Sequence, residues 1–168
     1  TGMTLASGAS INVDAGEIAG MLADESLGRL TISDQVITVN SAATISVDTA
    51  NLLEATTTGV VTASITTTET VSKLNTLTGT NGAYTIVVAT GDATSTTAAQ
   101  LNTLNGKTTV AVNLTNVTAL AGSSLSDLET LASAISADEF SNDTGLTTIA
   151  LTDTTIDATT LASTIDSY

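Results

Sequence analysis

Apolar and polar residues alternate in short runs along the chain, and most runs are followed by apolar residues at helical spacing. The alternating runs are rich in Val, Ile and Thr, which is typical of β-strands. They span 60–65, 84–88, 110–114 and 117–120, with looser examples at 11–13, 30–39, 45–47 and 146–151. Because strand side chains alternate between two faces, Val110 and Val112 are expected to point to one face and Ala111 to the other. Each run therefore has one apolar side.

The segment 125–135 has the clearest helical pattern. Ser124 or Ser126 can cap its N-terminus. Three apolar residues share one face of the predicted helix: Leu128, Leu131 and Ile135. A single buried stripe is also predicted at i, i+3 and i+6 from Val71, Leu74 and Leu77.

Further short helices are predicted over 15–23, ending before Asp24, and over 50–54 and 159–165. Helices this short are not stable alone in water. Packing against neighbouring elements must therefore stabilise them.

A repeat runs through these elements. Leu74-Asn75-Thr76-Leu77 recurs 27 residues later as Leu101-Asn102-Thr103-Leu104, each time after a β run and a Thr-rich turn. The same order of β run and helical segment recurs more loosely elsewhere, which predicts one repeat domain over 1–168. Its units are approximately 11–27, 28–57, 58–80, 81–106, 107–143 and 144–168.

A unit with one apolar side cannot bury that side alone, but stacked units can. We therefore expect an α/β repeat, a solenoid-like stack of β segments with short helices. Several units contain two β segments for one helix, which makes the spacing of about 4.8 Å between strands compatible with that of about 8–10 Å between helices. An all-β solenoid is the alternative, because Thr is a poor helix former and a good strand former.

The charge of the chain excludes some partners. Its 17 acidic residues face only Arg29, Lys73 and Lys107, for a net charge of −14. Such a field repels nucleic acid and anionic lipid and attracts cations. No run of about 18 apolar residues is present, so we expect no membrane insertion.

Several residue types needed for catalysis are absent. The chain has no Cys and no His, which removes thiolate nucleophiles, the usual general base and the commonest metal ligand. The alternative is a hydrolase that uses paired carboxylates, at Asp24-Glu25, Asp138-Glu139 or Asp153 with Asp157. A glycosidase of this kind generally needs aromatic sugar subsites, and aromatic residues make up only 2% of the chain. We therefore expect no enzyme activity.

One acidic segment is a candidate calcium site. Four residues with hard oxygen ligands gather within a few positions near Gly145: Asp138, Glu139, Asn142 and Asp143. Their spacing does not match the helix–loop–helix calcium loop, and a solvated acidic loop is the alternative. No other cofactor is expected.

Threonine-rich positions leave ice binding as another alternative, since regular outward Thr rows can order water. Thr66-Thr67-Thr68, Thr147-Thr148 and Thr154-Thr155 are the candidates, but their register is uneven between units. The preference of Thr for exposed strands explains them more simply.

Two longer phrases carry a resemblance, at 97–112 and 154–161. They resemble the Thr/Ala-rich repeat segments of giant bacterial cell-surface proteins of the cyanobacterial type, and the resemblance covers most of 59–166. It implies an extracellular repeat module of a long adhesin, sheath or surface-layer polypeptide, with no catalytic residues to carry over. Similar segments also suit fibres of viruses that infect such hosts.

These observations together predict a structural repeat module of an extracellular or cell-surface bacterial protein or fibre. It would act as a spacer, an adhesin stalk or a self-assembling filament subunit. Its expected partners are further copies bound end to end, or neighbouring repeats of a longer chain. A calcium-dependent ligand-binding module and a viral fibre segment are the alternatives.

Overall fold

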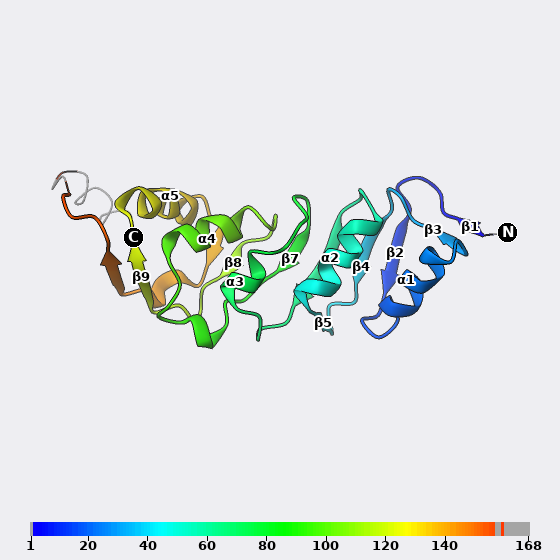
Figure 1. Ribbon diagram of the computed structural model, residues 1–168, viewed down its shortest axis with the longest axis horizontal. Coiled ribbons are helices and arrows are strands. Elements are labelled where there is room, and N and C mark those ends of the chain that lie inside the picture. The colour runs from blue at the N-terminus through cyan, green and yellow to red at the C-terminus, as the bar shows by residue number, and fades with distance from the viewer. Residues whose placement is uncertain (1, 157–158, 160–168) are drawn as a thin grey trace.

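The computed structural model describes residues 2–156 and 159 of the 168-residue chain. Its elements follow one another along a long axis, from β1 (Met3–Thr4) at one end to β11 (Thr148–Leu151) at the other (Figure 1). The chain is mixed α/β with parallel strands and short helices, as predicted. The all-β alternative is wrong.

Short helices recur along the described residues. They are α1 (Ile18–Ser26), α2 (Val47–Thr56), α3 (Val71–Leu74), α4 (Ala98–Asn105) and α5 (Leu125–Ser136), with the 3-10 turns η1 (Thr90–Asp92) and η2 (Asp143–Gly145). None of these helices is long and apolar enough to cross a membrane.

The strands between the helices are also short. Besides β1 and β11 they are β2 (Ser10–Val13), β3 (Leu30–Thr31), β4 (Val36–Val39), β5 (Thr44–Ile45), β6 (Val61–Ile65), β7 (Ala83–Thr85), β8 (Val112–Asn113), β9 (Ala119–Ser123) and β10 (Phe140–Ser141). Several helices are preceded by more than one strand, for example β1 and β2 before α1 and β8 and β9 before α5.

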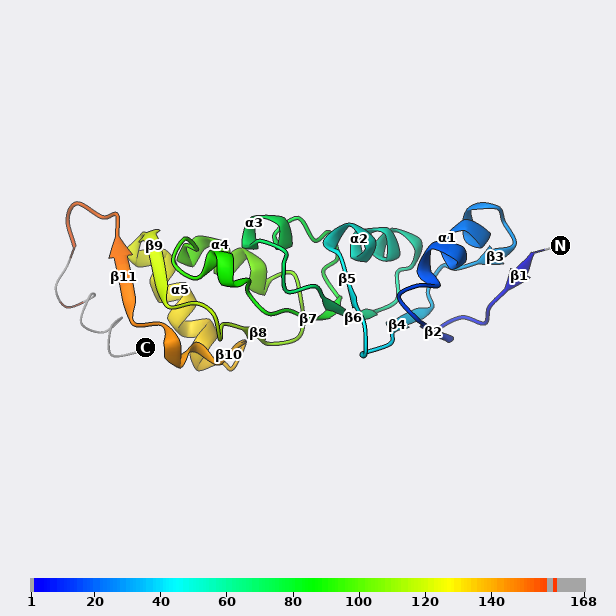
Figure 2. The same cartoon turned by 90° about the horizontal axis from the view of Figure 1, so that it is seen from below.

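Every strand pair among the described residues is parallel. The largest sheet has the order β2-β4-β6-β5, with β7 also paired to β6, and its register runs from Asn12 to Thr38 to Thr62. Smaller sheets pair β1 with β3, β8 with β10 and β9 with β11. Parallel neighbours require a crossover connection. The helices supply it, and Figure 2 shows α2, α3 and α4 along one long side with β4, β6 and β7 along the other.

The core lies between the strands and the helices. In β6, Val61, Ala63 and Ile65 are buried, while the residues between them are only partly covered. The facing helix α2 buries Val47, Ala50 and Leu53, which lie at i, i+3 and i+6. Both patterns match the periods expected of a strand and a helix that share one apolar interface.

The prediction for the helix around 15–23 was wrong at both ends. The Glu17 amide donates to the Asp14 carbonyl and closes a turn, so α1 begins only at Ile18. The helix then continues past Asp24 to Ser26. It ends where Gly28 adopts a φ of 68°, a left-handed conformation in which glycine has no steric cost.

Other β predictions also need correction. The run 30–39 forms two strands, because Gln35 between them turns its side chain back to accept from the Ser33 amide at 2.7 Å. Val47 begins α2 instead of continuing a strand. Val110 lies outside β8 and is 37% exposed, so it does not share the buried side of Val112.

The strongest helix prediction is confirmed. Ser124 is the N-cap of α5, and Leu128 and Leu131 are buried, while Ile135 is only partly buried. The stripe of Val71, Leu74 and Leu77 is buried as predicted, although α3 itself ends at Leu74. Apart from Thr159, the helix predicted over 159–165 lies outside the described residues.

Candidate functional site: contacts between successive helices

The predicted calcium ligands surround the end of α5. Asp138 follows the helix and Asn142 precedes η2, and both adopt left-handed backbone conformations, with φ of 59° and 56°. Between them Glu139 is exposed, and its Oε2 accepts from Asn105 Nδ2 of α4 at 2.5 Å. Asp143 lies in the first turn of η2.

These side chains do not form a recognisable metal centre. Within residues 2–156 and 159, no group of three or more His, Cys, Asp or Glu side chains could hold a metal ion. A calcium ion at these positions would need ligands from solvent or a partner in addition to the scattered carboxylates. The calcium site therefore stays a prediction.

The carboxylate pairs considered for hydrolysis have other contacts. Asp24 Oδ1 lies 3.3 Å from the Arg29 guanidinium on the surface. Asp153 Oδ2 accepts from the Leu125 amide at 2.7 Å, and Asp157 lies outside the described residues. The contact of Asp153 is with a backbone amide at the N-terminus of a helix, and similar contacts recur along the chain.

Most helices begin at a hydroxyl cap. The N-cap side chain of α2, α3, α4 and α5 accepts a hydrogen bond from the amide three residues later, in each case from Ser or Thr. These caps are Ser46, Thr70, Thr97 and Ser124. Each satisfies one of the amides that a helix N-terminus leaves without an intrahelical partner.

In each of these helices a second backbone amide donates a hydrogen bond to a side chain from a later part of the chain. The first helical amide of α2, that of Val47, donates to Glu69 at 3.1 Å, and the first of α3, that of Val71, donates to Asp92 at 2.7 Å. The Ala98 amide of α4 likewise donates to the Ser123 hydroxyl at 2.9 Å. We call the four side chains that accept in this way the N-terminal acceptors: Glu69, Asp92, Ser123 and Asp153.

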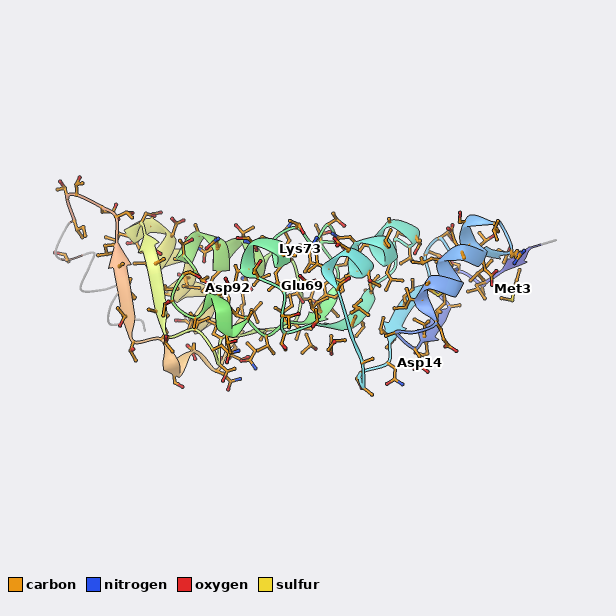
Figure 3. All side chains as sticks on the ribbon, turned by 60° about the horizontal axis from the view of Figure 1, so that its bottom comes forward. Met3, Asp14, Glu69, Lys73 and Asp92 are labelled. Atoms are coloured by element: carbon orange, nitrogen blue, oxygen red, sulfur yellow. The ribbon has the colours of Figure 1, made fainter. Side chains whose placement is uncertain are left out.

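The N-terminal acceptors join each helix to the segment that follows it. Each lies 21 to 28 positions after the amide that it binds. Figure 3 shows Glu69 and Asp92 in the middle of the long axis, well away from the N-terminal Met3. Three of them are carboxylates, which the partial positive charge of a helix N-terminus favours. They therefore stabilise both the helix and its contact with the next segment.

Asparagine side chains form a second set of contacts on the helices. Asn75 Nδ2 donates to the Gln100 carbonyl in α4 at 3.1 Å, and Asn102 Nδ2 donates to the Asp127 carbonyl in α5 at 2.9 Å. Both asparagines belong to the repeated Leu-Asn-Thr-Leu phrase. The repeat therefore encodes a contact with the following helix, 25 positions further along the chain.

Asn51 in α2 makes a related contact with a different geometry. Its Nδ2 donates to the Thr76 carbonyl at 3.0 Å, and its Oδ1 accepts from the Thr78 amide at 2.9 Å. This is possible because α3 ends at Leu74, so the Thr78 amide is not used inside a helix. We call Asn51, Asn75 and Asn102 the asparagine contacts.

The side-chain oxygens of Asn75 and Asn102 have a different environment. Both Oδ1 atoms are buried and have no hydrogen-bond partner among the described residues. Each asparagine faces the first turn of the next helix, where the amides of Gln100 and Asp127 are already bound by the caps Thr97 and Ser124. A buried acceptor without a partner carries an energetic cost.

A buried phenol links two elements further apart. Tyr84 of β7 is fully buried, and its hydroxyl donates to Glu54 Oε1 of α2. Burial, together with the hydrogen bond to Glu54, raises the pKa of Tyr84 far above its usual range. Gly79 and Gly82 leave room for this pair: a Cβ at Gly79 would meet the Glu54 carboxylate at 2.3 Å, and one at Gly82 would meet the Tyr84 ring at 2.1 Å.

A buried glutamine connects the N-terminal segments. Gln35 is 1% exposed, and its Nε2 donates to the Ala6 carbonyl at 2.9 Å. Its own carbonyl accepts from the Thr57 hydroxyl at 2.6 Å, and Gly59 packs against the same carbonyl. Three successive segments of the chain therefore meet at one buried residue, through its side chain on one side and its backbone carbonyl on the other.

Two further charged contacts lie on the surface. The Lys73 ammonium lies 2.5 Å from Asp48 Oδ1, and this hydrogen bond raises the pKa of Lys73. The Ser7 hydroxyl donates to the Asp34 carboxylate and lowers the pKa of Asp34. Both contacts are between neighbouring segments, but exposed pairs of this kind contribute little to stability.

The sequence analysis does not predict these contacts, although it contains their signals. The Asn of the repeated Leu-Asn-Thr-Leu segment marks one set, and Asp153, a catalytic candidate in the sequence, is one of the N-terminal acceptors.

Compared with known proteins, the chain matches no family model, no curated protein and no solved structure.

Proposed function

We propose that this chain is a structural repeat module of an extracellular bacterial surface protein or fibre, built as a solenoid-like stack. The stacked units are those outlined from the sequence, over 11–27, 28–57, 58–80, 81–106, 107–143 and 144–168. Its function is mechanical: the stack holds a fixed length and presents surfaces along it.

The observation that carries the proposal is the regular chain of contacts between successive helices. Each helix from α2 to α5 has its first amide bound by an N-terminal acceptor from the next part of the chain. The asparagine contacts join the same helices. In a stack of repeats the stability is a sum of contributions within units and between neighbours. Side chains placed between neighbours in this way suit that role.

Strand pairing supports the same arrangement. Parallel pairs join strands that are separated by one helix, such as β2 with β4 and β4 with β6. Each added unit can therefore extend the sheet and the row of helices together. This is the property that a spacer or stalk needs.

Self-association end to end is part of the proposal. Among the described residues, β1 pairs only with β3 and β2 only with β4, so each keeps one free edge. Neither strand carries Lys or Pro, which natural proteins use to block edge pairing. Met3 and Leu27 are 59% and 65% exposed at this end. The occupant that we propose is the opposite end of a second copy.

Electron microscopy of the purified chain at physiological salt, with and without millimolar calcium, tests the proposal. Ordered filaments support a self-assembling subunit. Filaments that require calcium would favour the calcium-dependent alternative. Strictly monomeric particles in sedimentation at high concentration would refute end-to-end association.

A matched pair of variants locates the contact. Leu27→Glu places a charge at the N-terminal end, while Leu52→Glu places the same charge on α2, where Leu52 is 56% exposed. We expect Leu27→Glu to shorten or abolish filaments and Leu52→Glu to leave them unchanged. Equal effects of the two substitutions would show that assembly does not use the N-terminal end.

A further inference from the structure

The chain contains two Asn-Gly dipeptides in contrasting environments, Asn81-Gly82 and Asn105-Gly106. An asparagine side chain can be attacked by the backbone nitrogen of the next residue. Glycine hinders this attack least, because it has no Cβ and the widest backbone freedom. The local structure then decides whether the nitrogen can approach the side-chain carbon.

The first dipeptide lies in irregular chain between α3 and β7. Asn81 is exposed, and its Oδ1 accepts from the Thr80 hydroxyl at 2.9 Å, which draws electrons from the side-chain carbonyl. Among the described residues no acceptor binds the Gly82 amide. The nucleophile is therefore not held by another hydrogen bond.

The second dipeptide is restrained. Asn105 is the last residue of α4, and its Nδ2 donates to Glu139 Oε2 at 2.5 Å. Gly106 continues with helical dihedral angles, φ −70° and ψ −1°. A helical backbone directs the next nitrogen away from the asparagine side chain, and the bond to Glu139 holds the amide that would have to leave.

We propose that Asn81-Gly82 is a self-modification site, at which Asn81 deamidates in the folded protein while Asn105 does not. The Gly82 nitrogen bonds to Cγ of Asn81, and the bond from Cγ to Nδ2 breaks. Nδ2 takes up the proton of the Gly82 amide and leaves as ammonia, and a cyclic imide that contains the Gly82 nitrogen remains. Water then opens the imide to aspartate or isoaspartate, without any oxidant or cofactor.

The product affects the contact between α2 and β7. The Gly82 backbone lies against the Tyr84 ring and Glu54, so that a Cβ there would meet Glu54 Oε1 at 2.8 Å. A carboxylate at position 81 adds negative charge one residue before Gly82, whose backbone packs against Glu54, and isoaspartate also lengthens the backbone before Gly82. Deamidation therefore weakens this contact as the protein ages.

The test is to incubate the folded chain at neutral pH and follow both sites by peptide mapping with mass spectrometry and isoaspartyl methyltransferase labelling. We expect Asn81 to convert at least about tenfold faster than Asn105, which corresponds to about 1.4 kcal/mol in activation free energy. The variants Asn81→Gln and Asn105→Gln assign each signal to its site.

A parallel incubation in concentrated urea separates structure from local sequence. Unfolding removes the restraint on Asn105, so the two rates should become similar. Equal rates in the folded protein, or faster conversion of Asn105, would overturn the proposal. A tenfold difference that persists in urea would overturn it as well, because it would then come from the flanking residues.

Discussion

The hydroxyl of Tyr84 donates a hydrogen bond of 2.5 Å to Oε1 of Glu54, which lies 30 positions earlier in the chain. The phenol is fully buried, and Glu54 is partly buried at the side of α2. Along the chain, β6 and α3 lie between the two residues. The contact therefore joins α2 directly to β7 across these two elements of the sequence.

Tyr84→Phe tests the energetic role of this contact. The substitution keeps the ring but leaves the Glu54 carboxylate without its buried donor. We expect a loss of about 1.5–3 kcal/mol in the free energy of unfolding, measured by urea denaturation. Glu54→Gln is the matched control, because its amide oxygen can still accept and the loss should be smaller. A Tyr84→Phe variant as stable as the parent would contradict this role.

The same hydrogen bond makes the free energy of unfolding depend on pH in the alkaline range. The pKa of Tyr84 is raised above the ordinary value of 10.0, so the unfolded chain loses this proton before the folded chain does. The stabilisation is fully present below about pH 10 and declines as the pH rises above it. Urea midpoints between about pH 8 and about pH 11 should fall more steeply for the parent than for Tyr84→Phe. Parallel pH profiles would show that Tyr84 does not titrate differently on unfolding.

Two glycines provide a matched test of the packing around Gln35. A Cβ at Gly59 would meet the Gln35 carbonyl oxygen at 2.4 Å, whereas a Cβ at Gly91 would meet nothing within 4 Å. We expect Gly59→Ala to cost about 1–3 kcal/mol and Gly91→Ala to be neutral or to stabilise by up to about 1 kcal/mol. Thermal unfolding of both variants measures the difference. A tolerated Gly59→Ala would show that the segments move apart easily at this point.

The asparagine contacts should differ in energy. Asn51→Ala removes a donor and an acceptor that both have partners, and we expect a loss of about 1–2 kcal/mol. Asn75→Ala removes one hydrogen bond but also a buried oxygen without a partner, so its net cost should be lower by about 1 kcal/mol. Urea denaturation of the two variants tests the order. The reverse order would indicate that a bound water satisfies Asn75.

The helical and strand periods could be predicted from the sequence because they depend on local spacing. The spacing of Leu128 and Leu131 and the cap Ser124 were sufficient for α5. The N-terminal acceptors could not be predicted, because Glu69 and Asp92 reach back 22 and 21 positions and their own neighbours do not reveal the partner. Gln35 could not be predicted for the same reason: its polar side chain is buried with the Ala6 carbonyl, 29 positions earlier, as acceptor for its Nε2.

The carboxylate of Asp92 offers the sharpest test of the N-terminal acceptors. Its partner helix α3 has a single turn, from Val71 to Leu74, so few other bonds can hold that N-terminus together. Asp92→Ala should cost about 1.5–3 kcal/mol. Asp92→Asn keeps an acceptor oxygen and removes only the charge. Its cost should be about 0.3–1 kcal/mol, which is typical of a charge at a helix terminus and is about a third of the cost of Asp92→Ala. Glu129→Gln is the control, because Glu129 is exposed on α5 and its side chain has no hydrogen bond among the described residues. It removes the same charge and should stay within about 0.5 kcal/mol of the parent. Urea denaturation measures the free energy of unfolding of the three variants. We expect Asp92→Ala to be the least stable, Asp92→Asn to be intermediate and Glu129→Gln to equal the parent. This order would show that contacts between successive helices stabilise the stack. Equal stability of all three variants would show that strand pairing and apolar packing suffice without them.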